Sequence, residues 1–509
     1  MSFRRRPLLV PALALATALA GCAAPAAERP GPTAAAPAEA AVPAGLAEYY
    51  GQELAWTGCG ADQQCADVTV PLDYARPDGE TITVAVRRLN SAEDDSRVGS
   101  LLVNPGGPGT PGTDYAEITL AGAMFTEDLR AAYDIVGFDP RGTGDSTPVD
   151  CVDDAELDRV RAAQHDTDAP GGLAGLAAAS EAIAQGCAER SGALLTEVDT
   201  ISAARDMDVL RHLLGEAQLD YLGFSYGTYL GATYAEQFPE NVGSFVLDGA
   251  MDPALSSHET VLGQARGFET ALRAYVEDCL GGAGCPLSGS VDDGVEQVRT
   301  LLEVTEDTPL PTSDGRELTA PLAFAGIITP LYNSATWFRL SQALDAAMRG
   351  DGSDLLFLAD FMAGRTADGS YPDNTTEANW AINCADFGAG GDPETWAAQA
   401  AELEQASPTF GELLAYGDVL CSEWPGDPAG ARGPLTAAGA NPIMVVGTTG
   451  DPATPYEWSV SLAEQLESGF LVTYDGEGHT AYRPTNECIA GAVDAFLIDG
   501  ARPAEGITC

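Results

Sequence analysis

The chain has 509 residues, of which 45% are hydrophobic and 20% charged, so we expect most of it to fold around a substantial core. Its formal net charge is −51, and all 25 basic residues are arginine, because the sequence contains no lysine. Such a surface repels phosphates, which excludes nucleic acid as an expected partner. The acidity indicates either plain solubility with a biased composition or an attraction for cationic substrates, such as peptides with a free amino terminus.

The N-terminus resembles an export signal. Arg4–Arg6 precede the apolar run Leu8–Ala20, which is shorter than the about 20 residues of a membrane span and is typical of a signal peptide. The run ends in Leu19–Cys22 (LAGC), which resembles a bacterial lipobox, where the cysteine is lipidated and becomes the first mature residue. The alternative is an ordinary signal peptide with a chance cysteine. We predict a lipoprotein signal peptide over residues 1–21 and a protein outside the cell, lipid-anchored through Cys22 or secreted.

Residues 22–45 are mainly Ala, Pro, Gly and Glu, which predicts a flexible tether. The ten cysteines that follow are even in number, as expected for disulfides in an exported chain. Sequence alone leaves their connectivity open, and the simplest pairing joins neighbours: Cys59–Cys65, Cys151–Cys187, Cys279–Cys285, Cys384–Cys421 and Cys488–Cys509. A zinc site is not predicted, since there is no C-x-x-C pair and only four histidines. No other metal or cofactor is predicted.

From about Leu46 the chain alternates short apolar runs with helical patterns, which indicates a mostly parallel sheet flanked by helices. The predicted strands and helices before residue 255 are Gly99–Asn104, Tyr133–Asp139, helix Thr200–Leu214, Asp220–Phe224, helix Tyr226–Phe238 and Gly243–Asp248. The pattern then becomes helical, and strands return at Pro442–Gly447 and Phe470–Asp475 before a helix near Glu487–Leu497. We therefore predict an α/β domain in two parts, residues 46–254 and 433–509, interrupted by a mainly helical cap over residues 255–432.

Gly223–Gly227 reads G-F-S-Y-G and lies between a predicted strand and a predicted helix. This G-x-S-x-G pattern is the nucleophile elbow of α/β-hydrolases, where small flanking residues allow a strained turn that exposes the serine oxygen. The position at a helix N-terminus favours developing negative charge. Ser225 is therefore the predicted nucleophile, and the predicted fold becomes an α/β-hydrolase fold with a cap.

A serine nucleophile needs a base, and His479 follows a late strand in a glycine-flanked loop that lets an imidazole reach back to it. In this fold the acid lies between serine and histidine in chain order, which predicts Asp451 after strand Pro442–Gly447. Asp248, at the end of an earlier strand, is the competing acid. Asp475 and Asp252 are expected to be structural.

The oxyanion hole needs two backbone N–H donors. Tyr226, directly after the nucleophile, is one expected donor. The second is expected in the glycine-rich loop Asn104–Gly109 (NPGGPG), with Gly107 first and Gly106 second. The motif Asp139–Ser146 (DPRGTGDS) is expected to tie loops together beneath the site.

In combination, these motifs resemble the actinobacterial tripeptidyl aminopeptidases and their relatives, exported α/β-hydrolases of the proline-iminopeptidase group. The similarity is carried by NPGGPG at Asn104–Gly109, DPRGTGDS at Asp139–Ser146, YLGFSYGTYLGATYAEQFP at Tyr221–Pro239, VLDGAMDP at Val246–Pro253, DPATP at Asp451–Pro455 and GEGHT at Gly476–Thr480. It covers residues from about 50 to 509. Pro105 stands where the proline-iminopeptidase group has histidine in HGGPG, which suits the tripeptidyl branch.

The resemblance implies a serine peptidase that releases short peptides, tripeptides in the nearest branch, from free N-termini. The family's nucleophile, acid and base fall on Ser225, Asp451 and His479. The cap of such exopeptidases supplies acidic residues for the substrate's ammonium group, and Asp386 is the candidate here. The alternatives are a carboxylesterase or lipase that uses the same triad and a non-catalytic lipoprotein that binds peptides.

Overall fold

The computed structural model describes residues 42–509 except 92–96, 389, 427 and 431. The predicted signal peptide over residues 1–21, Cys22 and residues 22–41 of the tether lie outside the described residues. Among the helices of the described part, none is both long and apolar enough to cross a membrane.

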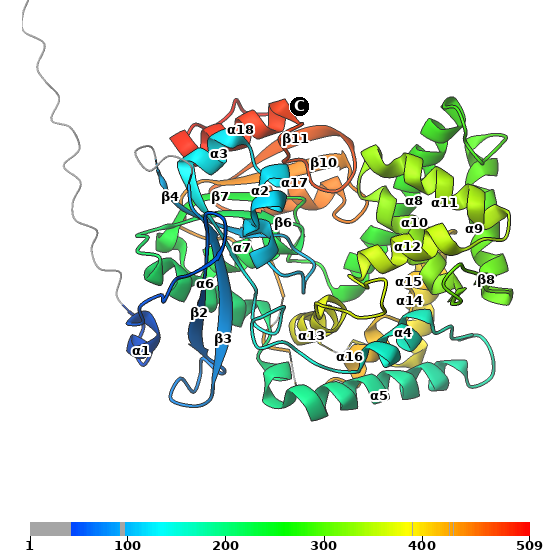
Figure 1. The fold of residues 1–509 in the computed structure, drawn as a ribbon, viewed down its shortest axis with the longest axis horizontal. Helices are drawn as coiled ribbons and strands as arrows, with labels where there is room; N and C mark the ends of the chain where they lie inside the picture. The colour runs from blue at the N-terminus through cyan, green and yellow to red at the C-terminus, as the bar shows by residue number, and fades with distance from the viewer. Residues whose placement is uncertain (1–41, 92–96, 389, 427, 431) are drawn as a thin grey trace, which may run out of the picture. The chain divides into compact units, whose positions relative to one another are not determined.

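A nine-stranded sheet forms the centre of the α/β domain (Figure 1). Its strands are β1 (Thr57–Gly60), β2 (Gln63–Pro71), β3 (Thr81–Leu89), β4 (Gly99–Asn104), β5 (Tyr133–Phe138), β6 (Leu219–Phe224), β7 (Val242–Asp248), β10 (Ile443–Gly450) and β11 (Gly469–Glu477). They lie in the order β1-β2-β3-β5-β4-β6-β7-β10-β11. The six strands from β5 to β11 in this order are parallel, so their carboxyl ends meet at one edge, while β1, β2 and β3 are antiparallel.

Helices cover both faces of this sheet, so its parallel strands are apolar on both sides. Along β4, Leu101 and Val103 face one hydrophobic cluster and Leu102 faces the other. The helices of the α/β domain are α1 (Ala47–Tyr50), α2 (Ile118–Met124), α3 (Glu127–Ala132), α6 (Thr200–Leu213), α7 (Tyr226–Gln237), α17 (Tyr456–Gln465) and α18 (Glu487–Asp499). One cluster contains residues of α6, α7 and α17, and the other contains residues of α2, α3 and α18.

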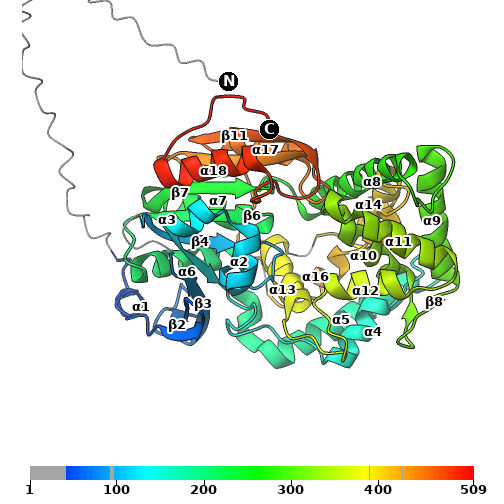
Figure 2. The ribbon, with the colours of Figure 1, turned by 45° about the horizontal axis from the view of Figure 1, so that its top comes forward.

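The connection from β7 to β10 carries a set of helices (Figure 2), most of which share a hydrophobic cluster separate from the two clusters at the sheet. They are α8 (Ser257–Gly281), α9 (Val291–Asp307), α10 (Ala320–Leu331), α11 (Trp337–Met348), α12 (Ser353–Met362), α13 (Thr375–Phe387), α14 (Pro393–Ala406), α15 (Gly411–Leu414) and α16 (Asp418–Ser422). A small antiparallel pair, β8 (Leu310–Pro311) and β9 (Glu317–Leu318), lies among them. We call this connection, residues 249–442, the cap.

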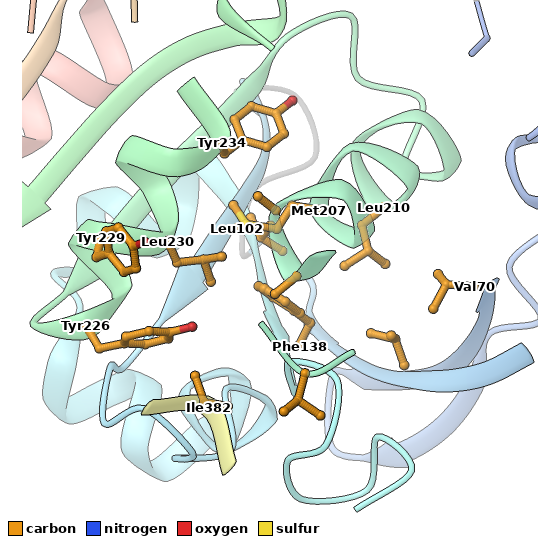
Figure 3. Packing of buried hydrophobic residues seen from close by; sticks show 14 of the residues in the cluster. Val70, Leu102, Phe138, Met207, Leu210, Tyr226, Tyr229, Leu230, Tyr234 and Ile382 are labelled. Atoms are coloured by element: carbon orange, nitrogen blue, oxygen red, sulfur yellow. The ribbon is translucent and has the colours of Figure 1, made fainter. Parts of the chain in front are cut away.

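Two features join the cap to the α/β domain. The helices α4 (Asp154–Ala162) and α5 (Gly172–Ser191) follow β5 in the chain, and they pack on α10 and α16 of the cap. Ile382 of α13 packs into the same cluster as Tyr226 and Leu230 of α7, as the close-up of that core shows (Figure 3). The cap therefore shares core packing with the helix that follows Ser225.

Five disulfides lie within the described residues, and each joins a cysteine to the next one along the sequence. They are Cys59–Cys65, Cys151–Cys187, Cys279–Cys285, Cys384–Cys421 and Cys488–Cys509. The fourth ties α13 to α16 within the cap, and the fifth ties α18 to the C-terminal residue. The bonds are therefore distributed over both parts of the chain.

Candidate active site

Ser225 lies between β6 and α7, at the carboxyl edge of the parallel strands. Its backbone has φ 55° and ψ −123°, a strained conformation for a residue with a side chain. Its N–H donates a 2.9 Å hydrogen bond to the carbonyl oxygen of Asp248. Glycine is required two residues earlier, because a Cβ on Gly223 would lie 2.5 Å from the carbonyl oxygen of Gly227. This is the geometry of a nucleophile elbow.

His479 follows β11 and is held by Asp451, which follows β10. Nδ1 of His479 lies 2.9 Å from each carboxylate oxygen of Asp451. The carboxylate also accepts N–H bonds from Ala453 and Thr454, each 2.9 Å, so its orientation is fixed by its own loop. Burial lowers the pKa of His479, but the charge and hydrogen bond of Asp451, with a smaller contribution from Asp248, raise it above its ordinary value. An imidazole so placed is oriented and made more basic.

The cap also holds His479. The backbone N–H of His479 donates a 2.8 Å hydrogen bond to the carbonyl oxygen of Tyr332, directly after α10. The Tyr332 ring packs edge-on against the imidazole, with ring centroids 5.4 Å apart. Asn333 pairs with Gly478 in an isolated β-bridge. These contacts were not predicted from the sequence, where no motif distinguishes this segment.

Asp248 does not contact the imidazole nitrogen that Asp451 occupies. Its carboxylate, which is fully buried, accepts hydrogen bonds from the backbone N–H groups of Ala481 and Tyr482. Burial raises the pKa of Asp248 to about 6, although the two N–H donors lower it. Of the two candidate acids, the structure brings Asp451 to His479.

The loop Asn104–Gly109 lies against Ser225. A Cβ on Gly106 would lie 2.8 Å from Cβ of Ser225 and 3.2 Å from the backbone nitrogen of Tyr226, so this approach requires a glycine. The N–H of Gly106 donates to Oδ1 of Asn104 at 3.0 Å. The N–H groups of Gly107 and Tyr226, by contrast, have no hydrogen-bond acceptor among the described residues.

Asp386 lies near the end of α13 and is buried. One carboxylate oxygen accepts the backbone N–H of Thr200 at 2.8 Å, and the other accepts the Thr200 hydroxyl at 2.6 Å. That hydroxyl also lies 2.5 Å from the hydroxyl of Tyr226. Burial raises the pKa of Asp386 to about 7, while the bonds from Thr200 lower it. Two hydrogen bonds thus connect Asp386 to the residue that follows Ser225.

Asp386 also lines a pocket of about 400 Å³ between the start of α8 and the end of α13. Its other charged or titratable lining residues are His258, Glu259, Asp418 and Arg432. Three of these five residues carry carboxylates, so the pocket wall is mainly acidic.

The Asp139–Ser146 motif contacts the framework of the domain. Arg141 is fully buried and pairs with both carboxylate oxygens of Asp206 at 2.7 Å. Nη1 donates to the carbonyl oxygens of Leu72 and Glu197, and Nη2 also donates to the carbonyl oxygen of Pro71. The N–H of Asp145 donates to Asp139. Arg141 therefore joins β2, α6 and the loop after β5.

Comparisons with known proteins identify the family of the chain. Residues 99–297 match the family described as "alpha/beta hydrolase fold", and residues 407–509 match "TAP-like protein". The chain is 36% identical to serine protease Hip1 of Mycobacterium tuberculosis over 486 residues, covering 90% of this chain and 91% of that protein. It is 38% identical to carboxylesterase B of the same species over 456 residues, covering 88% and 86%. It is 33% identical to the tripeptidyl aminopeptidase of Streptomyces coelicolor over 469 residues, covering 89% and 85%.

The fold and these matches define the chain as a serine hydrolase with an α/β-hydrolase fold. The chain belongs to the family of TAP-like α/β-hydrolases that includes serine protease Hip1 and the Streptomyces tripeptidyl aminopeptidases. The fold class and the family resemblance predicted from the sequence are both confirmed.

Proposed function

We propose that the protein is a serine exopeptidase that releases short peptides, tripeptides in particular, from free N-termini, with Ser225, His479 and Asp451 as its catalytic triad. The observation that carries the proposal is the Asp451–His479 pair at the strand edge where the strained elbow presents Ser225. A serine, an imidazole and a buried carboxylate in these roles perform acyl transfer. The peptidases among the relatives favour a peptide bond as the target.

In the proposed mechanism His479 accepts the Ser225 hydroxyl proton as the serine oxygen attacks the scissile carbonyl. The N–H groups of Gly107 and Tyr226 donate to the oxyanion that forms. The C–N bond then breaks, and His479 returns the proton to the leaving amine, which is the C-terminal part of the peptide. Water, deprotonated by His479, attacks the acyl-enzyme and releases the N-terminal peptide with a new carboxylate.

We further propose that the acidic pocket receives the ammonium group of the substrate through Asp386. A carboxylate has about four acceptor positions, and Thr200 occupies two of them, so Asp386 can accept further hydrogen bonds. Glu259 and Asp418 add negative charge to the same pocket, and this outweighs the one positive charge of Arg432. An ammonium group is thus favoured here over a neutral amide.

The substrate class is tested with a tripeptide chromogenic amide that has a free N-terminus, beside its N-acetylated form and a short-chain nitrophenyl ester. We expect acetylation to lower kcat/KM by about 10- to 100-fold, since hydrogen bonds to a charged group contribute about 1.5–3 kcal/mol. KM for the free amide should rise as the pH falls through about 7, because protonation of Asp386 removes its charge. KM for the ester should not change in this range.

The same three substrates distinguish the proposed peptidase from the main alternative, a carboxylesterase. One relative is named carboxylesterase B, and the triad attacks esters as well as amides. Ester cleavage with neither amide cleaved would make the protein a carboxylesterase and would contradict the peptidase proposal. Equal cleavage of the free and acetylated amides would contradict the role of Asp386. A non-catalytic peptide-binding lipoprotein would show no covalent labelling by a fluorophosphonate.

The location of the protein is proposed from its first residues and its disulfides. We propose that residues 1–21 are removed as a signal peptide, and that Cys22 carries the lipid anchor. Residues 22–45 then hold the folded part, including the cap, outside the membrane. Disulfides persist in oxidising compartments, so the five bonds support export.

Replacing Cys22 with alanine is expected to move the enzyme from the membrane fraction into the medium or the soluble fraction, because the acyl chains are its proposed attachment. Fractionation with an activity assay measures the change, and metabolic labelling with a fatty acid should mark the native protein alone. If the native protein and the Cys22→Ala variant occur in the medium in equal amount, residues 1–21 are an ordinary signal peptide and Cys22 is not lipidated.

A further inference from the structure

Asp248 binds the backbone of Ser225 and the backbone of the segment that follows His479. It is the last residue of β7, and its side chain is fully buried. Its carboxylate oxygens accept the N–H of Ala481, each at 3.0 Å, and one of them accepts the N–H of Tyr482 at 2.7 Å. These two residues lie immediately after His479 and Thr480. The carboxylate therefore fixes the segment on which the imidazole is carried.

The main chain of the same residue fixes the nucleophile. The carbonyl oxygen of Asp248 accepts the N–H of Ser225 at 2.9 Å. Asp248 is also aligned with Phe224 in the β6–β7 ladder and with Val446 in the β7–β10 ladder. Since β7 lies between two parallel strands, its last residue is held on both sides. Asp248 is therefore held rigidly, and the groups that bind to it, at Ser225 and after His479, are held at a fixed separation.

The backbone after Asp248 also comes close to the base. Gly249 has φ 68°, and a Cβ at this position would lie 3.2 Å from Cε1 of His479 and 2.9 Å from Cγ2 of Thr480. The imidazole therefore lies directly over the end of β7. A displacement of the segment from Thr480 to Tyr482 would move the ring relative to Ser225.

We propose that Asp248 is a positioning residue that sets the geometry between Ser225 and His479, its carbonyl holding the nucleophile and its carboxylate holding the segment after the base. This inference rests on the proposed triad. The carboxylate does not act as the triad acid, because Nδ1 of His479 is already bound by Asp451. Asp248 therefore acts through the backbone and through its charge.

The negative charge of Asp248 gives the proposal a measurable consequence, a change in the pH dependence of kcat/KM. The charged groups that act on His479 are Asp451, from the loop after β10, and Asp248, from β7. The titratable phenol of Tyr332, from the cap, packs against the ring. Both carboxylates raise the pKa of His479, so neutralising Asp248 should lower it. His479 must be neutral to act as a base, so kcat/KM falls at low pH as His479 becomes protonated. This fall, the acidic limb of the pH profile, should therefore move to lower pH when Asp248 is neutralised.

The test compares Asp248→Asn, which keeps one acceptor oxygen, with Asp248→Ala, which keeps none. Hydrolysis of the nitrophenyl ester and of the tripeptide amide is measured across pH. For Asp248→Ala we expect kcat to fall by about 10²-fold, the cost of a misplaced catalytic group, with little change in KM. Asp248→Asn should retain more activity than the alanine variant, and the acidic limb should move to lower pH in both.

Asp220→Asn is the matched control. Asp220 lies near the start of β6, at the opposite end from Ser225, and its carboxylate accepts a backbone N–H from Ser244 and the Tyr133 hydroxyl. It therefore shares the strand setting and the hydrogen bonding of Asp248 without contacting the site. We expect native kcat, KM and pH dependence for the folded Asp220→Asn enzyme.

An acidic limb that does not move in folded Asp248→Asn overturns the proposal, even if the variant is less stable. So does a kcat of Asp248→Asn equal to that of the native enzyme. If Asp248→Ala does not fold, Asp248→Asn alone decides the question. Ser225→Ala in the same assay keeps the two proposals apart, because esterase activity that survives it contradicts the triad, whatever Asp248 does.

Discussion

Replacing Ser225 with alanine is expected to lower kcat for both the peptide amide and the ester by about 10⁴- to 10⁶-fold, the range seen when a triad serine is removed. The acyl-enzyme cannot form without the serine oxygen. Activity that remains should come from the oxyanion hole and from substrate binding alone. Single-turnover assays with active-site titration by a fluorophosphonate measure the loss, and the variant should not be labelled.

Stability should not change with this substitution. The strain at residue 225 comes from its backbone, with φ 55°, and alanine carries the same Cβ as serine. The thermal unfolding midpoint of Ser225→Ala should therefore equal that of the native enzyme. Residual activity above about one hundredth of the native value in a folded, uncontaminated preparation would contradict Ser225 as the nucleophile.

Replacing Asp451 with asparagine is expected to lower kcat/KM by about 10⁴-fold at neutral pH. The carboxylate accepts the Nδ1–H of His479, and an amide nitrogen turned toward the ring would favour the tautomer that cannot accept the Ser225 proton. Loss of the charge also lowers the pKa of His479, so the remaining activity should extend to lower pH than in the native enzyme.

Asp475→Asn provides the control for this prediction. Asp475 is exposed near the end of β11 and accepts a hydrogen bond from the hydroxyl of Thr449. Its replacement should leave kcat/KM unchanged. If Asp248→Asn costs more activity than Asp451→Asn, the acid is Asp248, and the assignment made from the hydrogen bonds of His479 is wrong.

The strands that carry the site could be predicted from the sequence because they are covered on both faces. Such strands are continuous apolar runs, and Gly99–Asn104 is observed with the predicted bounds. The antiparallel strands β1, β2 and β3 were not predicted. β2, for example, alternates buried Val68 and Val70 with exposed Asp67 and Thr69, a weaker signal than a continuous run.

The prediction of the site was most informative where chemistry and local chain geometry coincide, as at Ser225. It was least informative for contacts between distant segments. Nothing local shows that Asp386 meets Thr200, 186 residues away, or that Tyr332 binds the backbone of His479. Such contacts depend on how the cap packs on the sheet. The sequence pattern of a single segment gives no information about that packing.

The bond from His479 to Tyr332 also constrains how the cap can move. If the cap swung away at each turnover, His479 would lose its backbone partner and the edge-on contact with the phenol ring, and it would have to be repositioned before every reaction. Under the proposed function, this contact couples the position of the cap to the catalytic competence of His479.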